Sequence, residues 1–273
     1  MNILETEALT KSFGELTAVD HFTLSVDAGE CFGLLGPNGA GKTTVIKMLT
    51  TLLPVTSGTA RIAGFDIRHR ANDVRRSIGY VPQILSADGT LTGYENLLVF
   101  SKLYDIPAAE RVPRIREALQ VMGLADAADR LVRTYSGGMI RRLEIAQSMI
   151  HRPRLLFLDE PTVGLDPLAR NAVWDYIRRL RTEYGMTIFL TTHYMEEAEV
   201  LCDRVAVMHL GKMAALGTPK ELEREVAEET GSVGAGNGIT LNEVFAHYTG
   251  GEVDSGGNYR DTSRVRRTAR RLG

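Results

Sequence analysis

A glycine-rich run near residue 40 has the residue types and the spacing that suit phosphate binding. It consists of Gly36, Pro37, Asn38, Gly39, Ala40, Gly41, Lys42, Thr43 and Thr44, and it matches the pattern G-x-x-x-x-G-K-[ST]. Glycine leaves the backbone N–H groups free to curl around a phosphate, because no side chain blocks them. An apolar segment precedes the run and a helical pattern follows it, so a helix N-terminus adds positive potential at the same point. The pattern predicts a nucleotide-binding P-loop, and the alternative is a chance glycine-rich turn.

Polar side chains with catalytic potential occur in this run and in a second segment far along the chain. The Lys42 ammonium is expected to reach the terminal phosphates, and the Thr43 hydroxyl is expected to ligate Mg²⁺. Asp159 and Glu160 directly follow an apolar segment, which stops abruptly at these two acids. Asp159 is placed to hold Mg²⁺ through water, and Glu160 to orient and deprotonate an attacking water. The alternative is that both carboxylates cap the following helix.

One histidine stands in a position that suits contact with a phosphate. His193 follows the apolar segment Ile188–Thr191, one predicted strand beyond the acidic pair, and we interpret it as a γ-phosphate contact. The alternative is a packed or surface histidine. The other histidines share no spacing typical of metal ligands and are assigned no metal: His21, His69, His151, His209 and His247.

These side chains require strands and helices that bring them together. An uninterrupted apolar sequence predicts strands buried on both faces, and four segments have it or come close to it: Cys31–Leu35, Ser77–Val81, Leu155–Leu158 and Thr187–Thr191. Phe22–Val26 alternates apolar and polar residues, which is typical of a half-exposed antiparallel strand. Val173, Tyr176/Ile177, Leu180 and Tyr184 recur at the spacing of one helix face, which predicts a helix that Gly185 ends. The alternation of buried strands with helices predicts a mainly parallel α/β sheet.

The middle and the end of the chain differ from this pattern. Between Thr92 and about Ile150 we expect helices only, over Asn96–Tyr104, Ala108–Met122 and Gly138–Ile150. We therefore expect a domain over residues 1–222 with a helical insertion at about 84–150. Residues 223–273 are expected to form a C-terminal extension, which includes the end of an acidic helix (Glu221–Glu229), a glycine-rich linker, a short amphipathic stretch (Leu241–Tyr248) and an arginine-rich tail.

Composition excludes several classes of function. The 273 residues are 44% hydrophobic and 24% charged, and the net charge is −2, so binding of nucleic acid through bulk charge is disfavoured. No apolar run approaches the ~20 residues that span a bilayer, and no secretory leader is expected. The two cysteines, Cys31 and Cys202, are expected to be buried and reduced. The tail places Arg260, Arg264, Arg267 and Arg271 on one face of a helix, if a helix forms there, for contact with anionic headgroups or an acidic partner; the alternative is a solvated tail.

A short motif in the helical segment indicates a family. Tyr135-Ser136-Gly137-Gly138-Met139, together with the P-loop, the acidic pair and His193, resembles the signature of the ABC ATPases, and the resemblance covers about Ile3 to Leu222. It implies a P-loop NTPase fold of the ABC type, with an antiparallel β subdomain and an α-helical insertion. The segments Thr192–Glu199 and Leu241–Phe245 resemble one branch, the ATP-binding subunits of bacterial drug-resistance and nodulation-type exporters.

The resemblance implies roles for further residues. Phe13 is similar to the aromatic residue that stacks on adenine, and Val19 is assigned to the same nucleotide site. Gln83 resembles the Q-loop glutamine, which contacts Mg²⁺ or the attacking water and flexes towards the membrane partner. Asp166 resembles the acid that crosses to the second subunit. Three signature residues are expected to bind the γ-phosphate of ATP held by the opposite P-loop, and their alternative role is that of an ordinary serine N-cap followed by glycines: Ser136, Gly137 and Gly138.

The same resemblance implies ATP and Mg²⁺ as ligands, closure of two such subunits around two ATP molecules, and multi-spanning permease subunits at the cytoplasmic face of a membrane. Export of drugs, lipids or other small molecules is the expected task. The alternative is a soluble ABC ATPase that acts on nucleic acid, a ribosome or another protein complex. The permease is expected to dock at about Ile84–Tyr104, where the apolar residues Leu91, Tyr94, Leu97 and Leu98 form either a groove wall or ordinary core.

Three positions depart from the family pattern. Tyr135 stands where leucine is usual, Met139 where glutamine is usual, and Val163 where a small polar residue often precedes Gly-Leu-Asp. The Ser-Gly-Gly centre is intact. We therefore expect phosphate contact to be retained, while packing and hydrogen bonding beside it differ.

Overall fold

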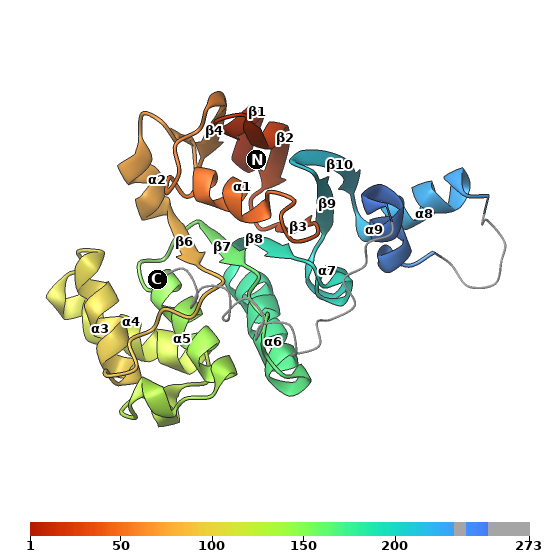
Figure 1. Ribbon diagram of the computed structural model, residues 1–273. Coiled ribbons are helices and arrows are strands. Elements are labelled where there is room, and N and C mark those ends of the chain that lie inside the picture. Colours follow the sequence, from red (N-terminus) through yellow and green to blue (C-terminus); the bar gives the residue numbers. More distant parts are fainter. Residues whose placement is uncertain (232–238, 251–273) are drawn as a thin grey trace, which may run out of the picture.

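A six-stranded sheet forms the centre of the computed structural model, which describes residues 1–231 and 239–250 (Figure 1). Its strand order is β10-β9-β3-β8-β7-β6, and every pair is parallel except β9 with β10. The strands are β3 (Cys31–Leu35), β6 (Ile78–Val81), β7 (Leu155–Asp159), β8 (Thr187–Thr192), β9 (Arg204–His209) and β10 (Lys212–Gly217). The mainly parallel α/β sheet that the sequence predicts is confirmed.

The central strands are buried on both faces, which explains their apolar sequence. In β3, Phe32 and Leu34 belong to the core on one face of the sheet, whereas Cys31 and Leu35 belong to the core on the other. Side chains on both faces of the strand therefore meet apolar neighbours, which favours apolar residues at consecutive positions. The segments β7 and β8 have the same two-sided burial.

A second, antiparallel sheet covers one face of the first, with strand order β2-β1-β4-β5. Its strands are β1 (Asn2–Phe13), β2 (Leu16–Asp27), β4 (Ser57–Ile62) and β5 (Phe65–Asp66). In β2, Phe22 and Val26 are buried while the intervening Thr23 and Ser25 are exposed, so the predicted alternation is confirmed. The helix α1 (Lys42–Leu49) packs into the core that the two sheets share.

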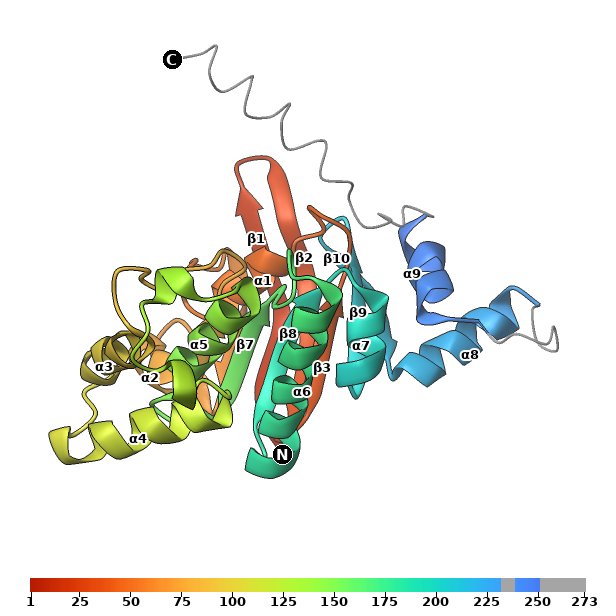
Figure 2. The ribbon, with the colours of Figure 1, turned by 90° about the horizontal axis from the view of Figure 1, so that it is seen from below.

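Helices cover the other face of the six-stranded sheet, with α6 beside β7 and β8 in two views (Figures 1 and 2). They include α5 (Gly137–Met149), α6 (Pro167–Tyr184) and α7 (Met195–Leu201). Gly185 ends α6 in a left-handed conformation, φ 62°, as predicted. The predicted helical spacing is confirmed: Val173, Ile177 and Leu180 are buried, whereas Tyr184, in the last turn next to the Gly185 cap, is 47% exposed.

The segment between β6 and β7 is helical, and it projects to one side of the sheets in Figures 1 and 2. It contains α3 (Gly93–Leu103), α4 (Ala108–Val121) and α5, with 3₁₀ turns at Ala125–Ala127 and Val132–Thr134. A separate helix, α2 (Ala71–Ser77), precedes β6. The helical insertion of the fold is confirmed.

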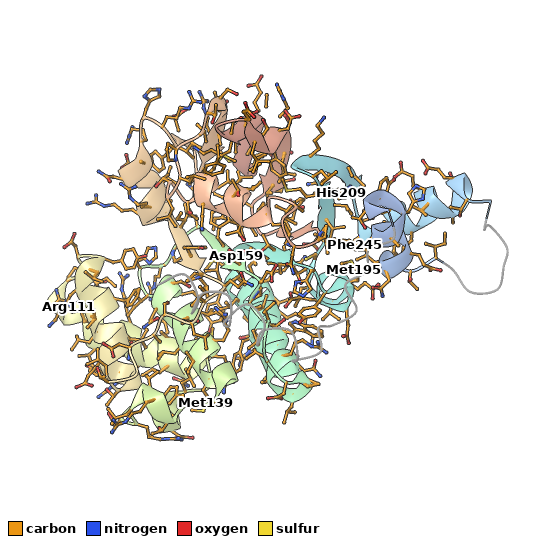
Figure 3. All side chains as sticks on the ribbon, viewed as in Figure 1. Arg111, Met139, Asp159, Met195, His209 and Phe245 are labelled. Atoms are coloured by element: carbon orange, nitrogen blue, oxygen red, sulfur yellow. The ribbon has the colours of Figure 1, made fainter. Side chains whose placement is uncertain are left out.

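Two further helices follow β10. They are α8 (Pro219–Glu229) and α9 (Leu241–Thr249), each begun by a threonine capping box. Leu222 of α8 and Phe245 of α9 join the core that covers β9, and Figure 3 shows Phe245 on the side of α9 that faces the sheet. The arginine face of the tail, from Arg260 to Arg271, lies outside the described residues. Within residues 1–231 and 239–250, no helix has the length and apolar composition to cross a bilayer.

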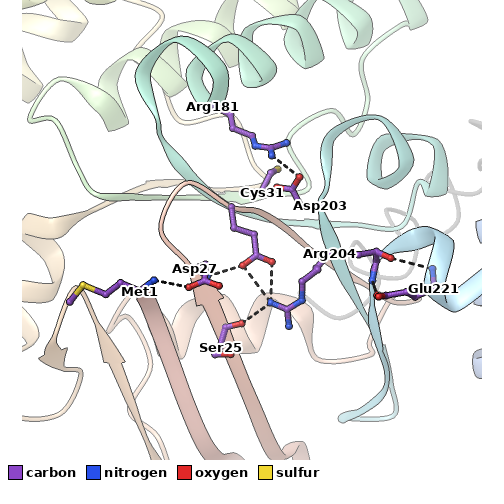
Figure 4. A network of polar contacts seen from close by, with 10 residues as sticks. Met1, Ser25, Asp27, Cys31, Arg181, Asp203, Arg204 and Glu221 are labelled. Atoms are coloured by element: carbon purple, nitrogen blue, oxygen red, sulfur yellow. Dashed lines mark hydrogen bonds and ion pairs between the residues drawn. The ribbon is translucent and has the colours of Figure 1, made fainter.

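A polar network fastens the amino ends of the central strands (Figure 4). Arg204 donates from Nη1 to Oε1 of Glu30 at 3.1 Å, and Arg181 donates from Nη2 to Asp203 at 2.6 Å. Asp203 in turn accepts the N–H of Cys31 at 3.0 Å. Cys31 and Cys202 are both buried and free, as predicted, and the neighbouring Cys31 thiol together with burial raises the pKa of Cys202.

Candidate active site

The predicted catalytic residues meet at one edge of the six-stranded sheet. The P-loop follows β3, Asp159 is the last residue of β7, and His193 directly follows β8. Because β3, β7 and β8 are parallel, their carboxyl ends lie at the same edge. Figure 3 shows Asp159 at this edge, near the centre of the molecule. The opposite edge carries the network of Figure 4.

The P-loop has a backbone that only glycine allows at its end. Gly41 has φ 109°, and a Cβ there would lie 2.5 Å from the carbonyl oxygen of Ala18. The helix α1 starts at the next residue, and no side chain caps it. The N–H groups of its first turn are therefore available to a phosphate.

Lys42 lies within the site rather than on the surface, with 4% of its area exposed. Its Nζ donates to the carbonyl oxygens of Gly36 at 2.7 Å and Pro37 at 3.2 Å, and it lies 3.3 Å from Oε1 of Glu160. Burial lowers the pKa of the Lys42 ammonium, and the nearby carboxylates of Glu160 and Asp159 oppose this shift.

Asp159 is 1% exposed and is held by two hydroxyl groups. Thr191 Oγ1 donates to Asp159 Oδ1 at 2.6 Å, and Thr43 Oγ1 donates to the same oxygen at 3.3 Å. Burial raises the pKa of Asp159, while these hydrogen bonds act in the opposite direction. The contact joins the two residues predicted to hold Mg²⁺.

Glu160 is the point where the remaining candidates converge. Its Oε1 faces Lys42, and its Oε2 accepts a hydrogen bond from Gln83 Nε2 at 3.2 Å and lies 3.2 Å from His193 Nδ1. Burial alone would raise the pKa of Glu160, but His193 and Lys42 outweigh it and hold the pKa below 4.5. A carboxylate that is ionised at neutral pH suits a general base.

The backbone of Glu160 is strained, which the sequence did not indicate. Its φ is 48°, a value rare for residues other than glycine, and such strain clusters at functional sites. The Glu160 N–H donates to the carbonyl oxygen of Thr191 at 3.1 Å and to its Oγ1 at 3.0 Å. Thr191 therefore positions both acids, and its only sequence signal is its place in the strand before His193.

A buried ion pair fixes the loop that carries Gln83. Arg141 in α5 donates to the carbonyl oxygens of Pro82 at 2.6 Å and Gln83 at 2.7 Å. Glu144, paired with Arg141 at 3.0 Å, accepts the N–H groups of Ser86 and, at 3.3 Å, of Ala87. Sequence reasoning missed this pair.

The signature residues and Asp166 are not part of this cluster. Ser136 caps α5 by accepting the N–H of Met139 at 3.3 Å, and Asp166 caps α6 by accepting the N–H of Ala169 at 2.9 Å. Gly138 faces Ala169, whose Cβ would lie 3.0 Å from an added Cβ. Among the hydrogen bonds and ion pairs of the described residues, none joins Ser136 or Asp166 to the P-loop or the acidic pair.

The predicted adenine-contact residues differ in exposure. Phe13 ends β1 and is 49% exposed, with Lys11 Nζ 4.9 Å from its ring centre. Val19 is fully buried, and its Cγ2 would lie 3.5 Å from a Cβ on Gly41. The exposed Phe13 ring is thus available for stacking, whereas the buried Val19 packs beneath Gly41 as part of the support of the P-loop.

One departure from the family pattern has a clear structural role. The Tyr135 hydroxyl donates to the carbonyl oxygen of Ala127 at 2.6 Å, and it lies 2.3 Å from where a Cβ on Gly93 would stand. The tyrosine therefore ties the signature to the rest of the helical insertion. Met139 and Val163 are half-buried.

The arrangement fits a magnesium nucleotide. The P-loop offers backbone N–H groups and the Lys42 ammonium to phosphates, and Thr43 and Asp159 offer oxygen atoms of the kind Mg²⁺ prefers. The Glu160 carboxylate lies beside Lys42, and its lowered pKa keeps it ionised at neutral pH. Together these groups can bind the phosphates and take a proton from water.

Comparison with known proteins identifies relatives. The ABC transporter family model matches residues 19–163. The chain is 49% identical over 220 residues to the daunorubicin/doxorubicin resistance ATP-binding protein DrrA of Streptomyces peucetius, covering 81% of this chain and 66% of that protein. It is 46% identical over 220 residues to the Nod factor export ATP-binding protein I of Ralstonia nicotianae, covering 81% and 68%. A dimeric ATP-binding cassette, MJ0796, bound to ADP and Pi in a post-hydrolysis state, has TM-score 0.70 and 25% identity and covers 79% of this chain and 98% of its own.

Proposed function

The chain belongs to the ABC transporter family of ATPases, and we propose that it is the ATP-hydrolysing subunit of an exporter whose membrane-spanning part lies on separate subunits. The observation that carries this proposal is the position of the Glu160 carboxylate beside the P-loop. There it contacts Lys42, Gln83 and His193. The drug-resistance and Nod factor export relatives support export, and a cargo of drugs, lipids or other small molecules.

The chemistry follows from the positions of these groups. The P-loop amides and Lys42 bind the phosphates of ATP, and Glu160 takes a proton from the attacking water. Gln83 and His193 orient that water and the γ-phosphate, because both reach Oε2 of the same carboxylate. Thr43, and Asp159 through water, would hold Mg²⁺, which would neutralise phosphate charge.

A second ATPase subunit completes each site in this proposal. Ser136, Gly137 and Gly138 would contact the γ-phosphate bound to the partner's P-loop, and Asp166 would cross to that subunit. Two observations support it. The start of α5 makes no hydrogen bond or ion pair with its own P-loop in the described residues, and the related cassette MJ0796 is dimeric.

A permease is proposed to dock on α3 and on the Q-loop, the segment 82–87 that contains Gln83. Ile84 is 81% exposed and Leu103 70%, and Val99 lies one turn before Leu103 on the same face of α3. Leu97, by contrast, is fully buried, so its core interpretation is the correct one. This docking would place the subunit peripherally at the cytoplasmic face of the membrane, without direct contact to nucleic acid.

Co-purification tests this assignment. The tagged chain, expressed together with the reading frames that neighbour its own, should be recovered from detergent-solubilised membranes with a multi-spanning protein. Ile84→Asp and Leu103→Asp should each reduce this recovery at least tenfold. Leu52→Asp, at a leucine that is 59% exposed outside the Q-loop and α3, is the matched control. Recovery with ribosomes or nucleic acid instead would contradict the proposal.

A further inference from the structure

A fully buried carboxylate without a catalytic role lies behind the site. Glu197 in α7 is 0% exposed. Its Oε1 accepts two hydrogen bonds of 2.8 Å, one from Thr162 Oγ1 and one from Trp174 Nε1. In the described part of the chain it has no ion-pair partner. Burial raises the pKa of Glu197, and the hydroxyl groups of Thr192 and Thr162 and the indole of Trp174 oppose this shift.

The first donor belongs to the turn that joins two functional acids. Thr162 is two residues after Glu160 and four before Asp166. The turn is closed by hydrogen bonds from Val163 N to Glu160 O at 3.3 Å and from Leu165 N to Thr162 O at 3.2 Å. Thr162 is 1% exposed. Among the described residues, its side chain is the only one of this turn that forms a hydrogen bond with α7.

Glu197 itself belongs to the segment that carries His193. Tyr194, the residue after His193, occupies the N-cap position of α7 without a side-chain capping bond, and its N–H donates to Thr192 Oγ1 at 2.9 Å. Glu197 lies in the first turn of that helix. A buried carboxyl group without a cation is costly, so we expect Glu197 to have a role that an apolar side chain cannot fill.

We propose that Glu197 is a positioning residue that couples the turn carrying Glu160 and Asp166 to the segment carrying His193. The inference rests on the proposed ATPase function. Through Thr162, a displacement of Asp166 by a second subunit moves Glu197, and with it the helix that follows His193. Glu197 touches neither the nucleotide nor the water, so its link affects the rate of hydrolysis and leaves ATP affinity unchanged.

The chain contains its own probe of this link. Trp174 is its one tryptophan, it is 4% exposed, and its indole N–H donates to the same carboxylate oxygen as Thr162. Its fluorescence therefore responds to the state of Glu197 without interference from other tryptophans. If the link operates, binding of MgATP changes this emission.

The experiment compares Thr162→Val with Thr162→Ser in the full-length protein. Thr162→Val should lower kcat about tenfold, the effect of one lost hydrogen bond in this setting, with KM for ATP within twofold of wild type. It should also abolish the MgATP-induced change in Trp174 emission. Thr162→Ser retains the hydroxyl and should restore both. Thr249→Val, which removes a buried hydroxyl bonded at 2.7 Å to Phe245 O in α9, is the control for non-specific loss.

Each outcome decides the matter. A wild-type kcat and emission response in Thr162→Val overturns the coupling. A Thr162→Val variant with a lower melting temperature, in which KM changes as much as kcat, also overturns the coupling. That pattern indicates that the contact is merely structural. If the wild-type chain hydrolyses no ATP, the proposed function fails, and the emission response of wild type against Thr162→Val still decides the coupling.

Discussion

Arg141 and Glu144 form an ion pair with 3.0 Å between Nη1 and Oε2, and their exposed fractions are 1% and 3%. They lie one turn apart in α5, the helix that begins at the signature. Together they satisfy the backbone of the Q-loop on both sides of its exposed apolar residue Ile84. The loop that carries Gln83 is therefore attached to the helical insertion, while its glutamine side chain reaches Glu160 on the sheet.

Replacing one member of this ion pair should destabilise the protein more than replacing both members. Arg141→Met leaves the Glu144 carboxylate buried without its cation, at a cost of about 3–5 kcal/mol. At roughly 2–4 °C per kcal/mol for a chain of this size, the melting temperature should fall by about 10 °C. The double variant Arg141→Met/Glu144→Leu should be more stable than the single one. Thermal unfolding followed by circular dichroism measures both, and a single variant as stable as wild type would contradict the prediction.

Glu160→Gln should abolish hydrolysis while ATP binding persists. The amide is isosteric and keeps an acceptor for Gln83, but it takes no proton from water, and loss of a general base costs about 10²–10⁴ in rate. Phosphate release and equilibrium binding of ATP measure the two effects. In size-exclusion chromatography with MgATP, the variant should accumulate as a dimer. Turnover at the wild-type rate would refute the assignment of the base.

Thr191→Val should impair both acids at once. The change removes the donor to Asp159 and one acceptor of the Glu160 N–H, and each loss costs about 1–3 kcal/mol in a buried site. We expect kcat to fall at least tenfold. Thr191→Ser keeps the hydroxyl and is the matched control, so equal activity of the valine and serine variants would exclude this role.

ATP affinity should decrease at alkaline pH, because Lys42 loses its proton there. Burial lowers the pKa of Lys42 in the free protein, and bound phosphates favour the charged ammonium and raise it again. Between these two pKa values ATP binding takes up a proton, so affinity should fall as pH rises through the lower one, below 10.5. Titrations between pH 7 and 10 measure the effect. In Lys42→Arg, where the cation keeps its charge, the dependence should flatten; a steep fall in that variant would point to another group.

The strands and the P-loop could be predicted because their signals are local. The residues of β3 are apolar at consecutive positions, and the glycine pattern follows directly, so fold and phosphate site can be recognised from one stretch of chain. Asp159 and His193 could be placed for the same reason, since Asp159 is the last residue of β7 and His193 directly follows β8.

The supporting residues could not be predicted, because their roles arise only from tertiary contacts. Arg141 and Glu144 have the i,i+3 spacing of an ordinary surface pair on a helix, and only the packing of α5 against the Q-loop buries them. Glu197 follows Glu196 in a charged stretch that is typical of a solvated helix face. The positive φ of Glu160 has no sequence signal, because glycine or asparagine is the usual residue in that conformation.

The burial of both cysteines has a practical consequence for measurement. The chain contains no other thiol, so a cysteine placed on its surface would be the one site that maleimide dyes label readily. Leu168, 82% exposed at the start of α6 and two residues after Asp166, is such a place. With donor and acceptor dyes on Leu168→Cys in the Glu160→Gln background, energy transfer would follow, in real time, two copies of the chain coming together.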